Sequence, residues 1–323
     1  MSLNTFMNYK VGQTPMYRAT SYCHSGNLYI KREDRNAHGS IKERAAYYII
    51  RDLIEGDKIG KSTKLVESSS GNLGLSLGYF AREIGIDFLC LVDPTLPPEK
   101  LELLVENKIQ IHSVALGSHS NYRDARIQMA HELDQQSDWI WTRQYSNPSN
   151  VRAHYESTGP EIWTQLDNHV DYVVCSVGSG GTISGVGRYI KQKCPTVSII
   201  AVEPTGSTIF GGIPGCYLSV GAGMSYTPEI IETYGDVIDY CCHVDDKDAL
   251  RECVRFFHTE SFQVGVTTGS VLVVALQIAL NNPTKRIVAI AADGGEKYAS
   301  LFLDVGSDAT ANSDVRLQKY HLD

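Results

Sequence analysis

Apolar residues along the chain fall into short runs typical of strands, separated by stretches with helical spacing. The runs are Leu28–Lys31, Lys64–Val66, Phe88–Val92, Ile109–Val114, Tyr172–Val177, Ser198–Val202 and Arg286–Ala291. Apolar positions repeat every three or four residues in Ile41–Leu53, Leu73–Ile84, Asn121–Leu133, Thr182–Ile190 and Asp246–Phe257. This alternation predicts an α/β fold with mainly parallel sheets.

The length of 323 residues exceeds what one hydrophobic core usually organises, so two domains are expected. We expect two sheets that face a shared cleft. The smaller, N-terminal domain is predicted at 36–147, and the larger one at 10–35 plus 148–305, with 144–150 as a crossing segment. The polar tail 306–323 is predicted to be frayed or an exposed extension.

Charge and composition favour a small-molecule partner. The net charge is −8, and Lys and Arg are scattered singly, which argues against nucleic acid as a partner. The start of the chain resembles no targeting peptide, and no apolar run approaches membrane-spanning length, so no membrane partner is expected. There is no HExxH motif or paired Cys/His pattern, so no metal site is predicted.

Eight cysteines are present without a CxxC pair, and most of them fall in strand-like or helix-like stretches. This usage suits reduced core thiols and predicts a cytoplasmic protein. The adjacent Cys241 and Cys242 could form a redox element, but buried strand positions are the favoured interpretation.

Three segments carry the candidate chemistry, and each follows an apolar run and opens a helix-like pattern. They are GSIK (Gly39–Lys42), SSSGNLG (Ser68–Gly74) and GSGGT (Gly178–Thr182). The first supplies a lysine that could form a Schiff base. The second offers backbone amides and hydroxyls for a carboxylate, and the third a glycine-rich cradle for a phosphate. Together they predict pyridoxal phosphate as cofactor.

Each segment has a plainer explanation when it is taken alone. Lys42 could be a surface lysine, SSSGNLG a helix N-cap, and GSGGT a tight turn that binds nothing. Their combination favours the cofactor site.

The motifs GSIKERA, ESSSGNLG, QYSNP, TGPEIW, GSGGT, AVEP, GVTTG and ADGGEKY occur in an order that resembles fold-type II pyridoxal-phosphate enzymes of the cysteine synthase and cystathionine beta-synthase family. The resemblance covers nearly the whole chain. It implies a tryptophan synthase beta-like fold with two three-layer αβα domains, a mobile smaller domain and a homodimer.

The resemblance also implies roles for individual residues. Lys42 corresponds to the Schiff-base lysine and Asn72 to the partner of the cofactor's 3'-oxygen. The phosphate cradle corresponds to Gly178, Ser179, Gly180, Gly181 and Thr182. The site for the substrate α-carboxylate corresponds to Ser69, Ser70, Gly71, Asn72 and Gln144.

Thr267 corresponds to the hydroxyl that faces the pyridine nitrogen. A neutral hydroxyl cannot keep that nitrogen protonated as a carboxylate would, so transamination is disfavoured and β-elimination remains easy. Thr267 could also be a plain turn residue. The resemblance implies that Lys42 removes the Cα proton, that an aminoacrylate forms, and that a nucleophile adds to it.

Two departures from the cysteine synthase pattern point to a siderophore branch. Leu73 replaces the usual Thr and Tyr145 the usual Phe, as in N-(2-amino-2-carboxyethyl)-L-glutamate synthases of 2,3-diaminopropionate biosynthesis. In that branch O-phospho-L-serine provides the aminoacrylate and the amine of L-glutamate attacks it. Arg126 and Tyr145 are the candidates for binding a glutamate carboxylate.

Plainer explanations apply to both residues: Arg126 could be a solvent-facing helix charge, and Tyr145 could be core packing. The regular GSGGT cradle, and GAGM at Gly221–Met224 without the branch's Arg, resemble cysteine synthases instead. The leaving group, phosphate or acetate, and the nucleophile, glutamate or sulfide, therefore stay open. A β-lyase or deaminase, or a non-catalytic protein of this fold, are the remaining alternatives.

Overall fold

The computed structural model describes residues 2–69, 71–96, 98–119, 121–219, 221–302 and 315–321. The chain forms two compact units. The first comprises Met1–Val11 and Lys42–Asn150, and the second Gly12–Ile41 and Val151–Asp323. Compared with the predicted range 36–147, the first unit begins at Lys42, ends at Asn150 and also includes the N-terminal residues.

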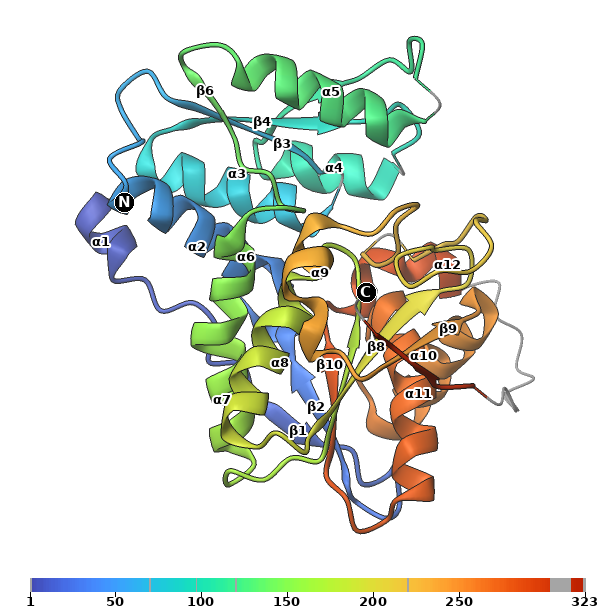
Figure 1. Cartoon of the computed structure of the whole chain (residues 1–323). Coiled ribbons are helices and arrows are strands. Elements are labelled where there is room, and N and C mark those ends of the chain that lie inside the picture. Colours follow the sequence, from blue (N-terminus) through green and yellow to red (C-terminus); the bar gives the residue numbers. More distant parts are fainter. Residues whose placement is uncertain are drawn as a thin grey trace. The chain divides into compact units, whose positions relative to one another are not determined.

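The first unit is built on a parallel sheet of four strands in the order β5-β4-β3-β6. The strands are β3 (Lys64–Ser68), β4 (Asp87–Val92), β5 (Gln110–Ser113) and β6 (Trp139–Trp141). Its helices are α1 (Leu3–Met7), α2 (Lys42–Glu55), α3 (Asn72–Ile84), α4 (Pro98–Glu106) and α5 (Tyr122–Asp134), and α6 (Pro148–Ala153) follows β6. Helices α2 and α3 lie on one face of the sheet and α5 on the other, which gives three layers (Figure 1).

The N-terminal helix joins the first unit through aromatic packing. The ring of Phe6, which is completely buried, packs against Tyr47 of α2 and Phe80 of α3, with ring centroids 5.1 and 5.5 Å away. Burial of such a ring is worth about 2–3 kcal/mol. This contact explains why residues far before the sheet belong to this unit.

The second unit contains a mixed sheet of seven strands in the order β1-β2-β10-β7-β8-β9-β11. The five central strands run parallel: β2 (Leu28–Arg32), β10 (Ile287–Ala291), β7 (Tyr172–Ser176), β8 (Ser198–Pro204) and β9 (Tyr240–Val244). The edge strands β1 (Met16–Arg18) and β11 (Gln318–Lys319) are antiparallel to their neighbours.

Helices cover both faces of this sheet. Helices α7 (Gly159–Gln165) and α8 (Gly181–Lys193) lie on one side, and α10 (Asp246–Glu260) and α11 (Val266–Asn281) on the other (Figure 1). The short helices are α9 (Glu229–Tyr234) and α12 (Ala299–Phe302). The predicted α/β fold with mainly parallel sheets is confirmed.

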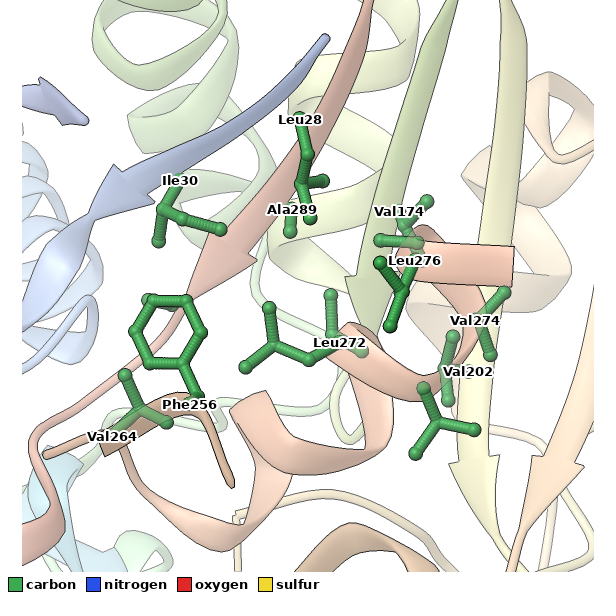
Figure 2. Close-up of a cluster of buried hydrophobic side chains, with 14 of the residues drawn as sticks. Leu28, Ile30, Val174, Val202, Phe256, Val264, Leu272, Val274, Leu276 and Ala289 are labelled. Atoms are coloured by element: carbon green, nitrogen blue, oxygen red, sulfur yellow. The ribbon is translucent and has the colours of Figure 1, made fainter. Parts of the chain in front are cut away.

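The core of the second unit lies between the sheet and helix α11. Figure 2 shows Leu272 and Leu276 of α11 facing Val174 of β7 and Ala289 of β10, with Phe256 of α10 beside them. Helix α11 is buried on nearly every side. Because a helix buried all round has no polar face, its sequence lacks the amphipathic spacing that reveals the other long helices.

All seven predicted strands and all five predicted helices are present, within a few residues of their expected limits. The buried positions of Cys241 and Cys242 in β9 are likewise confirmed. Of the eight cysteines, Cys194 is partly exposed and Cys216 exposed, and the other six are buried. Burial raises the pKa of Cys241 to about 11, so this thiol stays protonated at neutral pH.

The polar C-terminal tail, expected to be frayed or an exposed extension, adds a short edge strand to the sheet. Within it, β11 pairs with β9, and the backbone of Val315 accepts and donates hydrogen bonds with the Gln277 side chain of α11. The residues of β11 are exposed, so this strand extends the sheet without adding to its core. Residues 303–314, 322 and 323 of the predicted tail lie outside the described residues.

None of the described helices is both long and apolar enough to span a bilayer. No cluster of three or more His, Cys, Asp or Glu side chains suited to a metal ion occurs within the described ranges.

Candidate active site

The carboxyl ends of the parallel strands in the first unit bring several predicted site residues to one edge of its sheet. Strand β3 leads into Ser69, β4 into Asp93, and β6 into Gln144 and Tyr145. Strand β3 pairs with both β4 and β6, so the three segments are neighbours. This edge is where open α/β sheets bind ligands.

Both the side chain and the backbone of Ser69 are held by hydrogen bonds. Its hydroxyl accepts a 3.1 Å hydrogen bond from the amide of Gly74, and its carbonyl accepts a 2.7 Å hydrogen bond from the thiol of Cys90. Burial raises the pKa of the Cys90 thiol to about 12, which keeps the proton that this bond requires. The conformation of Ser69 is therefore fixed by the neighbouring strand β4 and by the first turn of α3.

Gly71, at the start of α3, has open space beside its backbone. Ser70, a predicted carboxylate-binding residue, lies outside the described residues. Gly71 caps the N-terminus of α3 without a side chain, and a Cβ atom added there would meet nothing within 4 Å. Asn72 begins the helix and is half-buried, and Leu73 behind it is buried in the core. The free space and the helix N-terminus suit an anionic group.

Gln144 is buried, and its backbone and side chain are tied to the end of β3. Its amide donates to the carboxylate of Glu67 at 3.1 Å, and its Nε2 donates to the carbonyl of Ser68 at the same distance. Its own carbonyl accepts a 2.9 Å hydrogen bond from Asn150. The structure thus joins Gln144 to Ser68, the first residue of the SSSGN segment.

Glu67 was not identified by the sequence analysis. It occupies an inward position of β3 and is completely buried. Burial raises the pKa of its carboxyl, and the four hydrogen bonds that it accepts act in the opposite direction. A glutamate inside an apolar strand pattern, one residue before a serine run, is the only sequence signal that marks it.

Arg126 is buried, which excludes the solvent-facing alternative. Only 8% of the residue is exposed, and its guanidinium lies 3.7 Å from the carboxylate of Asp93 at the end of β4. Its Nε atom has no hydrogen-bond partner among the described residues. The charge of Arg126 also acts on the Cys90 thiol, where it opposes the pKa increase that burial and Glu67 produce. The structure therefore brings Arg126 close to Cys90, whose thiol holds the backbone of Ser69.

Tyr145 follows Gln144 at the same edge and is half-buried. Its position beside Gln144 is fixed by the chain. Lys42 begins α2 and is also half-buried.

The segment before Lys42 is anchored within the second unit. The amide of Ile41 donates to Ala292 at 2.8 Å, and Ser40 forms a bridge with Asp293. Gly39 adopts a left-handed conformation with φ of 67°, and its carbonyl accepts a 3.3 Å hydrogen bond from Lys297. Burial lowers the pKa of Lys297. The GSIK and ADGGEKY motifs are therefore joined in space, which fixes the backbone that leads into Lys42.

In the second unit, GSGGT forms the turn between β7 and α8. Gly180 is the N-cap of α8, has φ of 88°, and carries no capping side chain. A Cβ atom on Gly180 would lie 2.6 Å from Ile231, and one on Gly178 would lie 2.9 Å from the carbonyl of Gly221. Only glycine fits these positions, so backbone amides and the helix dipole are presented to a ligand.

The loop Gly221–Met224 lies directly against this cradle. The amide of Gly223 donates a 2.7 Å hydrogen bond to Val177, the residue before Gly178. The amide of Met224 donates a 2.9 Å bond to the hydroxyl of Ser207, which in turn donates to the buried carboxylate of Glu203. Through Ser207, Glu203 thereby holds the loop Gly221–Met224 in place beside the GSGGT turn.

Thr182 completes the cradle beside a histidine that the sequence analysis did not identify. The Thr182 hydroxyl lies 3.2 Å from Nε2 of His154, and Nδ1 of His154 lies 2.9 Å from the hydroxyl of Thr158. His154 is almost completely buried. It fixes the side chain of Thr182 at the start of α8.

Thr267 lies in the first turn of α11, and only 2% of it is exposed. Its hydroxyl has no hydrogen-bond partner within the described part of the chain, although it is buried. Its methyl group lies close to Gly221, the residue that faces Gly178. A buried hydroxyl without a partner costs about 1–3 kcal/mol, so this atom fits an acceptor on a bound group.

These features fit pyridoxal phosphate. In the cradle, Gly178 and Gly180 leave no room for a side chain, and the buried Thr267 hydroxyl near the same loop is a neutral group of the kind that could pair with the pyridine nitrogen. The structure places Gly178, Ser179, Gly180, Gly181, Thr182 and Thr267 in the second unit, and Lys42, Ser69, Gly71, Asn72, Arg126, Gln144 and Tyr145 in the first.

Comparison with known proteins gives consistent matches. The family model described as "Pyridoxal-phosphate dependent enzyme" matches residues 7–293. The chain is 35% identical over 301 residues to the N-(2-amino-2-carboxyethyl)-L-glutamate synthase of Ralstonia nicotianae, covering 91% of this chain and 88% of the relative.

Solved structures agree with this family. An O-acetyl serine sulfhydrylase, isoform 3, from Entamoeba histolytica has a TM-score of 0.85 at 25% identity, over 95% of this chain and 92% of the other. An O-ureido-L-serine synthase also has a TM-score of 0.85, at 27% identity, over 95% of this chain and 96% of the other. Both are similar to this chain over nearly its full length.

Proposed function

Because this chain belongs to the pyridoxal-phosphate dependent enzyme family, with the fold-type II architecture of the cysteine synthases, we propose that it joins L-glutamate to an activated L-serine. The reaction is a β-replacement on O-phospho-L-serine. The amine of L-glutamate replaces the phosphate, and the product is N-(2-amino-2-carboxyethyl)-L-glutamate. The relatives named as synthases support the β-replacement class.

The observation that carries the choice of glutamate is the burial of Arg126. A guanidinium has five N–H donors, and Arg126 has one long ion pair and an Nε without a partner among the described residues. Keeping a charge in such surroundings is costly unless a ligand pairs with it. Sulfide carries no carboxylate for this group, whereas glutamate carries two.

When bound, pyridoxal phosphate supplies an electron-accepting ring that stabilises negative charge at Cα of an amino acid. The amine of Lys42 anchors the cofactor and then holds the proton taken from Cα. Thr267 gives the ring nitrogen a neutral hydroxyl partner, which limits the lifetime of that negative charge and favours loss of the β-substituent.

The remaining residues bind and orient the two substrates. Ser69, Gly71 and Gln144, together with Ser70, hold the α-carboxylate of the serine derivative through hydroxyl and amide donors. Asn72 binds the cofactor's 3'-oxygen. Arg126 and the phenol of Tyr145 hold a carboxylate of glutamate, so that its amine is presented to the β-carbon.

Sulfide is the second candidate nucleophile, favoured by the regular glycine cradle and by the similarity to an O-acetyl serine sulfhydrylase. We propose the cytoplasm as compartment, since six of the eight cysteines are buried free thiols. A homodimer and a role in making 2,3-diaminopropionate for a siderophore follow from the motif resemblance and belong to the same proposal.

The test uses purified protein loaded with pyridoxal phosphate. O-phospho-L-serine and O-acetyl-L-serine are each incubated with L-glutamate, with sulfide or with buffer alone, and the products are identified by mass spectrometry. We expect the glutamate adduct from O-phospho-L-serine. Cysteine as the only product would assign sulfide as the nucleophile, and pyruvate at the same rate in every mixture would assign a β-lyase.

A further inference from the structure

The carboxylate of Glu67 accepts four hydrogen bonds at the end of β3. Its Oε1 atom accepts from the amide of Ser68 at 2.8 Å and from the indole of Trp141 at 3.4 Å. Its Oε2 atom accepts from the hydroxyl of Thr142 at 2.6 Å and from the amide of Gln144 at 3.1 Å. No cation pairs with this carboxylate among the described residues, although it is completely buried.

The two backbone donors belong to the two segments that frame the carboxylate pocket. Ser68 precedes Ser69, and its carbonyl accepts the side-chain amide of Gln144 at 3.1 Å. Each segment is therefore bound to Glu67 through its backbone and to the other segment directly. A shift of the Glu67 carboxylate would move Ser69 and Gln144 relative to each other.

A carboxylate is required here because all four neighbours act as donors. In a glutamine at this position one of the two atoms would be an NH2 group, which would face the amide of either Ser68 or Gln144, whichever way the side chain is turned. A backbone amide cannot reverse its role, whereas the hydroxyl of Thr142 can. One segment would then lose its bond and leave a buried donor unpaired.

We propose that Glu67 is a positioning residue that sets the affinity of the site for the α-carboxylate of the amino-acid substrate. It acts by holding the backbones of Ser68 and Gln144, and it does not touch the substrate itself. The inference rests on the proposed role of Ser69 and Gln144 as the carboxylate pocket.

The test compares two ligands that differ by the carboxylate alone. L-Alanine and ethylamine both react with the cofactor through their amine, and only L-alanine carries the α-carboxylate. Their dissociation constants are measured from the change in visible absorption of the bound cofactor. In Glu67→Gln we expect the constant for L-alanine to rise about tenfold, equivalent to about 1.4 kcal/mol, and that for ethylamine to stay unchanged.

Thr142→Val is the matched control, because it removes one donor to Glu67 and leaves both backbone bonds in place. Its constant for L-alanine is expected to stay within about threefold of the wild type. Glu67→Asp keeps the charge but shortens the reach by one methylene, so a loss confined to L-alanine is expected there too.

An equal loss for both ligands in the Glu67 variants, or a loss in Thr142→Val as large as in Glu67→Gln, would show that Glu67 has only a structural role. Neither ligand has a leaving group and no second substrate is present. The measurement therefore tests the role of Glu67 even if glutamate is not the second substrate.

Discussion

The guanidinium of Arg126 lies 3.7 Å from the carboxylate of Asp93, and both side chains are largely shielded from solvent. Asp93 is fixed in turn, since its carboxylate accepts hydrogen bonds from the amide and the hydroxyl of Thr95 at 3.2 and 2.5 Å. The pair is long for an ion pair of this kind. Under the proposal above, Arg126 keeps donors for a glutamate carboxylate while it remains paired with Asp93.

Arg126→Ala is expected to raise KM for glutamate at least about tenfold, because the loss of a charged hydrogen bond costs about 1.5–3 kcal/mol. Steady-state kinetics with varied glutamate measure this change. Release of phosphate from O-phospho-L-serine without glutamate should be retained. Arg143→Ala is the control, since Arg143 is half-exposed and pairs with Asp134 at the surface of the same unit. Equal effects of the two variants would contradict the assignment.

Thr267→Val is expected to have opposite effects on the apoprotein and on the cofactor-bound enzyme. It removes a buried hydroxyl without a partner among the described residues, so the apoprotein should gain up to about 1 kcal/mol. The bound enzyme should lose stability, because the ring nitrogen loses its partner. Thermal unfolding with and without pyridoxal phosphate measures both changes.

Thr268→Val is the matched control for this pair of measurements. The Thr268 hydroxyl is also buried and lacks a partner in the described part of the chain. Its removal should stabilise both forms equally. The assignment of Thr267 would be wrong if Thr267→Val shifted the two forms by the same amount.

Alanine substitutions at Gly178 in GSGGT and at Gly71 in SSSGNLG are expected to have different effects on stability. Gly178→Ala places a methyl group 2.9 Å from a carbonyl of the supporting loop and should cost about 1–3 kcal/mol as well as weakening cofactor binding. Gly71→Ala meets no atom within 4 Å and should leave stability within about 1 kcal/mol of the wild type. Equilibrium unfolding and cofactor titration measure both, and a reversed order would exclude the phosphate cradle described above.

The pair of His243 and Glu203 predicts a pH dependence of stability. Nε2 of His243 lies 2.8 Å from the buried Glu203 carboxylate, and this hydrogen bond raises the pKa of His243. The folded protein therefore binds this proton more tightly than the unfolded chain. The resulting stability is complete below the unfolded pKa of about 6.5 and is lost as pH rises through the folded pKa.

His243→Gln removes this titrating group, so its unfolding free energy should fall less than that of the wild type between about pH 6 and the higher folded pKa. Denaturant unfolding at several pH values measures the two slopes. Identical slopes would show that the protonated pair does not stabilise the loop that Glu203 holds.

The sequence predicted most of the fold because most elements carry an apolar run or a helical spacing of apolar residues. The limits of helix α2 and strand β3 differ from prediction by only a few residues. Helix α11 was not predicted because it is buried on nearly every side. The three-residue strands β1 and β6 are too short for periodicity to reveal.

The site was predictable where its residues are contiguous in the chain. In both GSGGT and SSSGNLG a glycine caps the N-terminus of the helix that follows, so each motif lies where its helix begins. Glu67 and His154 act through partners distant in sequence, such as Gln144 and Thr182, and no local pattern marks such contacts. The burial of Arg126 depends on how α5 packs on the sheet, which its own helical spacing does not specify.

The most direct test of the central claim is a competition between nucleophiles in one reaction. The cofactor-loaded enzyme receives O-phospho-L-serine with equal concentrations of 15N-labelled L-glutamate and sulfide, and both products are quantified by mass spectrometry. The account predicts that the labelled glutamate adduct predominates in the wild type and that Arg126→Ala shifts the ratio toward cysteine. Predominance of cysteine in the wild type, with a ratio that Arg126→Ala leaves unchanged, would contradict it.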